Sequence, residues 1–183
     1  MNIAEWINRW RHNKGYGVHS PLAYDFLREA IAERRGYGYY GYERLEAMAG
    51  SSGTGQLERR ARLLLRIAVR EQPSTVWISP KTPEILVEAV RTAGSVMRIY
   101  DGEYSPEEVK RADMIVAWKR LPRGFYKKMR EGEATAVCFD IGEKKTRELG
   151  KKTGESIVFD MGGSAIVIAR KGISGVVYKI KRS

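Results

Sequence analysis

The sequence predicts an α/β fold whose sheet is mostly parallel and closes with an antiparallel hairpin. From residue 56 onward, short β-rich apolar runs alternate with amphipathic segments at helical spacing. Strands that alternate with helices form a parallel sheet, because the crossover helices must cover its faces. The stretch "SIVFDMGGSAIVIARK" differs, since only Gly162 and Gly163 separate its two apolar runs. A glycine pair between two strands is typical of a tight hairpin, and therefore of an antiparallel pair.

Length and composition fit one ordinary domain with a small appendage. The chain has 183 residues, of which 43% are apolar, enough for a real core. We divide it into an N-terminal helical and aromatic segment, residues 1–55, and an α/β domain, residues 56–183. No apolar run is as long as a membrane span, and the N-terminus has no apolar signal core, so we expect a cytoplasmic protein. The single cysteine, Cys138, is interpreted as a small buried hydrophobe within a strand.

The N-terminal segment is expected to contain a helix that begins at Pro21. Ser20 is a good N-cap, proline is favoured at the first helical position, and Gly36 ends the helical pattern. No helix or strand is predicted between Gly36 and Gln56. The run "GSSGTG" in this interval is interpreted as a flexible connector, because it lacks the preceding strand and the Lys-Ser/Thr pair of a phosphate loop.

The α/β domain begins with a helical stripe from Leu57 to Ala68 that stops before Pro73. The predicted strands that follow are 75–79, 96–100, 114–118, 135–140, 156–161, 164–170 and 176–181. The predicted helices between them are 83–93, 106–112, 124–130 and 143–152.

The net charge of +11 suggests an anionic partner, such as a nucleic acid or an anionic lipid surface. The basic residues are, however, spread over the whole chain in small clusters, including "ERRAR", "WKRLPR" and "EKKTR". Most clusters fall on predicted helix faces beside glutamates. This pattern favours an ordinary solvated surface over a dedicated nucleic-acid interface.

Several motifs give the chain a resemblance to a known family. "RHNKGYGVHSP" followed by an apolar helix resembles the RH…HSP opening of a bacterial group of methyltransferase-like proteins. "DMIVAWK", "VCFDIG" and the closing hairpin resemble the later strands of that group, which has the class I S-adenosylmethionine-dependent methyltransferase fold. The resemblance implies a Rossmann-like methyltransferase domain over residues 56–183, with S-adenosylmethionine as the cofactor if the chain binds one.

The cofactor motif of this family is altered here. The family ends its first strand in an acid followed by G-x-x-x-G, and this chain has Trp77 at the acid position and Ser79 and Pro83 at the glycine positions. The family has glycine where the backbone closely approaches the ligand, and a larger side chain at such a position fills the space that the ligand needs. Trp118 likewise replaces an acid at the end of the family's fourth strand. We therefore expect no open pocket beside residues 79–82.

The spacing also implies the loss of one edge strand, because only one short helix fits between Asp101 and Asp113. Asp101 matches the family residue that binds the ribose hydroxyls, or it is a solvated turn residue. Asp140 ends a strand at the ligand-binding edge, or it caps the next helix. Lys81 and Thr82 are positioned either to hold an anion at a helix N-terminus or only to start that helix.

The two histidines and the tyrosine-rich run each have two interpretations. His12 and His19 are either general bases above the sheet edge or polar pins that fix the N-terminal helices to the sheet; we favour the pins. Tyr39 and Tyr40 either stack on nucleic-acid bases or pack as aromatic anchors, and we favour packing. No cysteine or acid lies at ligand spacing from a histidine, so no metal site is predicted.

Three functional hypotheses follow. The altered motif favours a methyltransferase-fold protein that is inactive or impaired in cofactor binding and serves as a binding or scaffold module. The first alternative is an active methyltransferase of unknown substrate. The second is a basic nucleic-acid-binding protein on the same fold.

Overall fold

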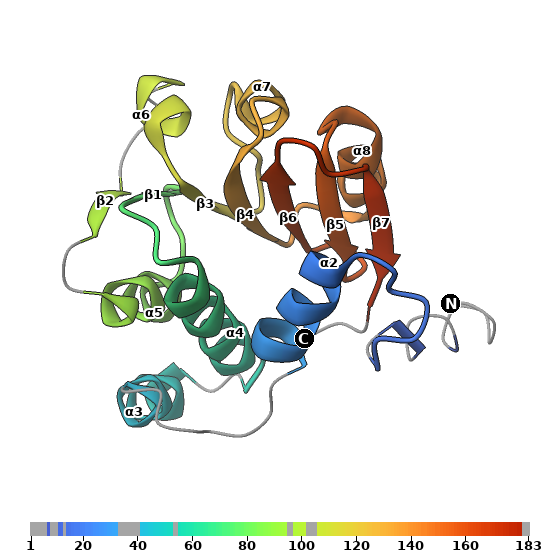
Figure 1. The fold of residues 1–183 in the computed structure, drawn as a ribbon. Coiled ribbons are helices and arrows are strands. Elements are labelled where there is room, and N and C mark those ends of the chain that lie inside the picture. Colours follow the sequence, from blue (N-terminus) through green and yellow to red (C-terminus); the bar gives the residue numbers. More distant parts are fainter. Residues whose placement is uncertain are drawn as a thin grey trace.

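Figure 1 shows the computed structural model of the chain, which describes residues 7, 11–12, 14–32, 41–52, 55–94, 97–101 and 106–180. The described residues form one seven-stranded sheet in the order β2-β1-β3-β4-β6-β5-β7. The strands are β1 (Thr75–Ile78), β2 (Arg98–Asp101), β3 (Met114–Trp118), β4 (Glu133–Phe139), β5 (Ser156–Asp160), β6 (Ala165–Arg170) and β7 (Val176–Lys179).

The sheet is mostly parallel, as predicted. Only β6 runs against its neighbours, pairing antiparallel with both β4 and β5, whereas every other adjacent pair is parallel. Gly162 and Gly163 join β5 to β6 with φ angles of 72° and 108°, in the left-handed region that glycine adopts without steric cost. The predicted hairpin is therefore confirmed, and the architecture is Rossmann-like.

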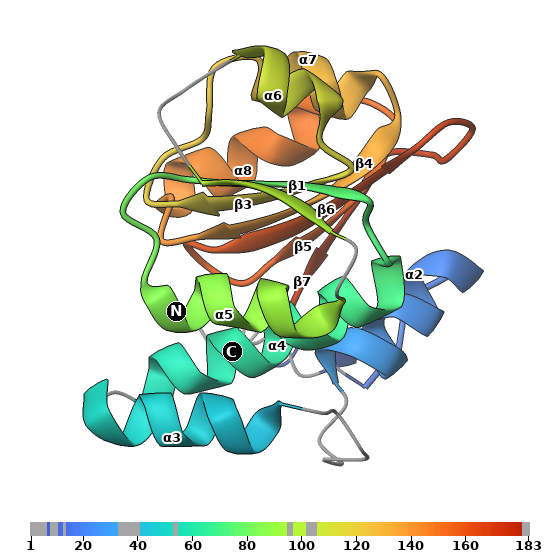
Figure 2. The same cartoon turned by 90° about the vertical axis from the view of Figure 1, so that its left-hand side faces the viewer.

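Helices cover both faces of the sheet (Figure 2). One layer contains α2 (Pro21–Phe26), the π-helical turn η1 (Leu27–Ile31), α4 (Gly55–Glu71) and α5 (Glu84–Ala93), with α3 (Tyr42–Ser52) packed on the outer side of α4 and α5, away from the sheet. The other contains α6 (Pro106–Arg111), α7 (Phe125–Arg130) and α8 (Glu143–Lys152). Each layer has its own hydrophobic cluster against the sheet. Burial on both faces explains why the strands are apolar throughout rather than alternating.

The predicted start of α2 is confirmed. Pro21 occupies the first turn, and the backbone N–H of Ala23 donates to Ser20 Oγ over 3.3 Å. The predicted end at Gly36 lies outside the described residues. Cys138 is fully buried in β4, which confirms its interpretation as a core residue, and burial raises the pKa of its thiol far above the usual range. No helix in the described ranges is long and apolar enough to cross a membrane.

The helix α3 was not predicted. Glycines on both sides obscured a segment, Tyr42–Ser52, that is rich in good helix formers. Leu45 of this helix is fully buried, and Arg44 Nε forms an ion pair with Glu88 of α5 at 2.9 Å. Because α3 continues to Ser52 and α4 begins at Gly55, the predicted connector "GSSGTG" is wrong over most of its length.

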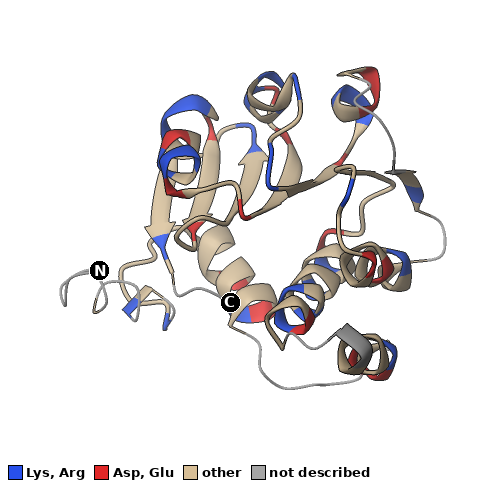
Figure 3. Ribbon diagram, turned by 180° about the vertical axis from the view of Figure 1, so that it is seen from behind, with Lys and Arg blue, Asp and Glu red and all other residues tan. Residues whose placement is uncertain are grey.

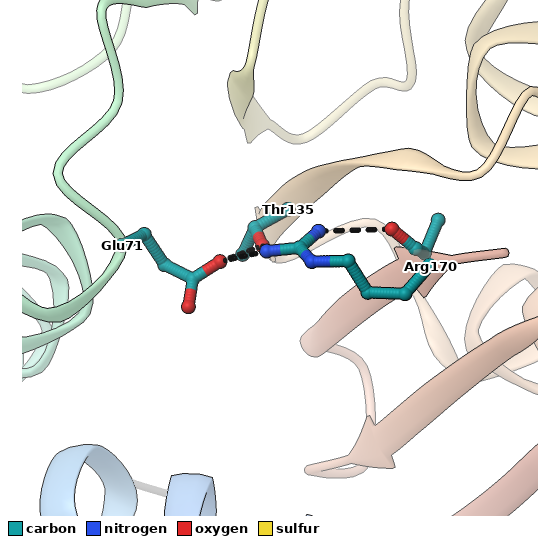
Figure 4. Close-up of polar contacts among 4 residues, drawn as sticks. Glu71, Thr135 and Arg170 are labelled. Atoms are coloured by element: carbon teal, nitrogen blue, oxygen red, sulfur yellow. Dashed lines mark hydrogen bonds and ion pairs between the residues drawn. The ribbon is translucent and has the colours of Figure 1, made fainter. Parts of the chain in front are cut away.

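A polar cluster fixes α4 to the sheet at the edge where β4 begins (Figure 4). Glu71, the last residue of α4, accepts hydrogen bonds from Thr135 Oγ1 of β4 and from Arg170 Nη2 of β6, the latter at 2.5 Å. Arg170 Nη1 also donates to the carbonyl of Ala169 over 2.9 Å. Thr135 is buried and the Glu71 side chain is 12% exposed, so little water can replace these contacts.

We expect Glu71→Gln to lower the free energy of unfolding by about 1–2 kcal/mol, because the carboxylate charge that strengthens the hydrogen bonds from Thr135 and Arg170 is lost in a partly buried site. Chemical denaturation of the two proteins measures this difference. The exposed residue Glu107 provides the control, since Glu107→Gln should change stability by less than about 0.5 kcal/mol. Equal effects of the two substitutions would show that the cluster contributes nothing specific.

Candidate functional site

The strand order identifies the position where this sheet can hold a ligand. From β1 the chain passes through α5 to β2, which pairs with one edge of β1. It then returns through α6 to β3, which pairs with the other edge of β1. The helices that follow β1 and β2 therefore lie on opposite faces of the sheet. The carboxyl ends of β1 and β3 flank this topological switch point, where open α/β sheets bind their ligands.

A pocket of about 390 Å³ lies at this switch point. Its described lining residues come from the segments that follow β1 and end β3: Ser79, Pro80, Lys81, Trp118, Lys119 and Arg120. The lining contains three cationic side chains, one indole ring and, among the described residues, no carboxylate. The pocket is thus basic and partly aromatic.

The expectation that no pocket lies beside residues 79–82 is therefore wrong. The indole of Trp77 does not point toward the strand end but packs into the core beneath α6 and α7, where it is fully buried. Pro83 caps the start of α5 and is not among the pocket-lining residues. Trp77 does not fill the space at the strand end, because alternate side chains of a strand point to opposite faces of the sheet, and Pro83 lies beyond the strand at the start of α5.

The first wall of the pocket is a closed turn. The backbone N–H of Ser79 donates to the carbonyl of Val116 over 2.9 Å, which extends the pairing of β1 with β3. Thr82 Oγ1 donates to the carbonyl of Ser79 over 2.6 Å. The Thr82 hydroxyl is thus committed to the turn, while Lys81 at its tip is exposed with φ 63°.

The second wall follows β3. The backbone N–H of Lys119 donates to the carbonyl of Phe139 over 2.8 Å. The ammonium of Lys119 lies 5.8 Å from the centroid of the Trp118 ring. Arg120 is exposed beside it. Lys119 has φ 61°, in the left-handed region that costs a non-glycine residue energy.

Left-handed backbone is concentrated at this edge of the sheet. Four non-glycine residues in the described ranges have positive φ, and three of them, Lys81, Lys119 and Asp140, follow the carboxyl ends of β1, β3 and β4. The fourth, Gln72, follows α4. Such conformations persist where the surrounding structure imposes them, and they are frequent at ligand sites.

Asp140 lies next to the pocket in an ion pair with Arg60 of α4. Arg60 Nη1 and Nη2 donate to Asp140 Oδ2 and Oδ1 over 2.8 and 2.7 Å, a bidentate arrangement. The Arg60 side chain is 9% exposed, and its guanidinium lies 5.7 Å from the Trp118 ring and 5.6 Å from the Phe139 ring. The carboxylate is therefore neutralised by a buried cation and is not a free base.

The structure brings some of the predicted site residues together and separates others. Ser79 and Lys81 line the pocket, Thr82 belongs to the turn, and Asp140 is paired with Arg60 beside it. Asp101 is the last residue of β2, opposite Ile78 in the register, and its side chain is outside the described part of the structure.

The predicted substrate-side residues lie elsewhere or are not described. His12 Nδ1 is 3.1 Å from the carbonyl of Lys179, and its ring packs edge-on against Tyr178 of β7. Four strand positions separate β7 from β3, or about 19 Å at the usual spacing. His19 is exposed just before the cap of α2. Tyr39 and Tyr40 lie outside the described residues.

Sequence reasoning missed three residues of the site. Lys119 and Arg120 belong to the cluster "WKRLPR", which was interpreted as solvated surface, although its position directly after a strand was a signal. Arg60 was assigned to a charged helix face, and only the packing of α4 against the ends of β3 and β4 reveals it beside Asp140.

The described residues contain no group of three or more His, Cys, Asp or Glu that could hold a metal ion. Comparison of the chain with protein-family models and with curated proteins finds no match. The function is therefore inferred from the chemistry of the switch-point pocket.

Proposed function

We propose that the chain is a methyltransferase-fold protein that does not use S-adenosylmethionine and serves as a binding module. The observation that carries this proposal is the charge at the switch point. The cofactor has a sulfonium cation and an ammonium group, which need nearby acids or other acceptors. This pocket instead presents Lys81, Lys119 and Arg120, and the nearby Asp140 is neutralised by Arg60.

The strand order of the sheet is compatible with the proposed methyltransferase fold. The antiparallel β6 between β4 and β5 corresponds to the closing hairpin of the methyltransferase layout, and β2 at the edge is what the loss of one edge strand would leave. Methyl transfer to a hydroxyl or a protonated amine would also need a base near the reacting atoms. The described lining of the pocket contains no histidine or carboxylate.

Calorimetric titration of S-adenosylmethionine into about 100 µM protein is expected to give no saturable heat, because the cationic lining repels the sulfonium. A dissociation constant below about 100 µM would overturn the proposal and favour the active methyltransferase. S-adenosylhomocysteine, which lacks the sulfonium charge, is the control for affinity to the rest of the cofactor.

A nucleic-acid-binding function has weaker support. Figure 3 shows Lys and Arg mixed with Asp and Glu on the helices rather than gathered on one of them. Several of these cations are paired with neighbouring acids, such as Arg62 with Glu58 and Lys152 with Glu148. Such pairs reduce the net field that a nucleic-acid backbone would meet.

A further inference from the structure

We propose that the switch-point pocket binds a phosphorylated small molecule, with the phosphate held by Lys81, Lys119 and Arg120. This inference extends the proposed function, since it names the ligand class for the same site. β1 and β3 are adjacent strands, about 4.8 Å apart, so the segments that follow them hold the three cations on neighbouring turns.

These three cations differ from many others on the surface because no carboxylate in the described part of the chain pairs with them. Elsewhere, for example, Arg91 pairs with Glu84 and Arg147 with Glu143. Three like charges around one hollow repel one another, and a bound dianion would remove that repulsion. The same charges disfavour cationic and neutral ligands relative to anions.

The backbone supports the same conclusion. Lys81 and Lys119 are both left-handed, although lysine has no side-chain group that favours this conformation. The turn at Lys81 is closed by Thr82, and Lys119 is tied to Phe139 of β4, so both lysines start from backbone held by the neighbouring strands. Positions held in this way orient a side chain more consistently than a free loop does.

The size and the remaining lining indicate a ligand larger than inorganic phosphate. A volume of about 390 Å³ falls in the range of small-molecule sites. Pro80 and the partly exposed Trp118 supply apolar surface next to the cations. A phosphate attached to a compact organic group, such as a nucleoside phosphate, matches this combination of charge and apolar wall.

The test is a titration of ADP, pyrophosphate and adenosine into the 183-residue chain at low salt. We expect ADP and pyrophosphate to bind saturably and adenosine not to bind, with affinity falling as salt increases. Absence of binding by ADP, or equal binding by adenosine and ADP, would overturn the proposal. S-adenosylmethionine should not displace ADP; displacement would refute the proposed function, whereas absent ADP binding alone would refute only this inference.

The variants Lys81→Asn and Lys119→Asn remove charge while keeping a residue that tolerates left-handed backbone. We expect each of them, and Arg120→Gln, to weaken ADP binding about fivefold or more, since each removes a charge-assisted contact. Arg130→Gln is the matched control, because Arg130 is exposed at the end of α7, far from the strand ends that form the pocket. Equal weakening by the Arg130 variant would show that binding depends only on net charge.

Discussion

Asp140→Asn is expected to lower the free energy of unfolding by about 2–4 kcal/mol, because it leaves the buried charge of Arg60 without its counterion. Asparagine has nearly the same shape as aspartate and tolerates the left-handed backbone at this position, where φ is 54°. The substitution therefore tests the charge and not the turn. Chemical denaturation with a two-state fit gives the difference.

The reciprocal substitution should cost less. Arg60→Met removes the buried cation and leaves a carboxylate that is 39% exposed and can be solvated. Methionine also retains apolar contact with the Trp118 and Phe139 rings. Replacing a buried ion pair by apolar groups is often close to neutral, so the double variant should be more stable than Asp140→Asn alone. If Arg60→Met is the more damaging single change, the guanidinium contributes mainly through packing on the two rings.

The sequence predicted the elements of this fold well because their signals are local. Short continuous apolar runs, a glycine-pair hairpin and a Ser-Pro helix start each depend on a few neighbouring residues. The predicted strand 114–118 agrees with β3 at both ends, and the predicted helix 143–152 agrees with α8. The helix α3 was missed because flanking glycines outweighed its helix-forming interior, which α5 stabilises through Glu88.

The site was less predictable because its properties depend on side-chain direction and on distant partners. Trp77 was correctly located in β1, but whether its indole faced the strand end or the core depended on which helices cover that face. Arg60 and Asp140 are 80 residues apart in the chain, so their pairing has no local signal. The basic cluster "WKRLPR" has the composition of a solvated surface, and its place at the switch point depends on the strand order, which the cluster itself does not reveal.

The second large effect is expected at Phe159. Its ring is fully buried in β5 and stacks with Phe26 of α2 and with Tyr178 of β7, with centroid distances of 5.8 Å to each. Phe159→Ala should lower the free energy of unfolding by about 3–5 kcal/mol, since it removes a large buried side chain and both ring contacts. Phe159→Leu should cost clearly less, because most of the volume remains.

The stack of Phe26 on Phe159 makes it possible to test whether α2 unfolds separately from the sheet. α2 lies in the N-terminal segment, yet Phe26 belongs to the same hydrophobic cluster as Phe159 and Ile166 of the sheet. Hydrogen exchange of Phe159→Ala should therefore show amides of α2 opening at lower free energy than those of β3 and β4. Phe125→Ala is the control, because it creates a similar cavity beneath α7 on the opposite face. If both variants weaken α2 and the central strands equally, α2 unfolds only with the whole sheet and the Phe26 contact does not hold it independently.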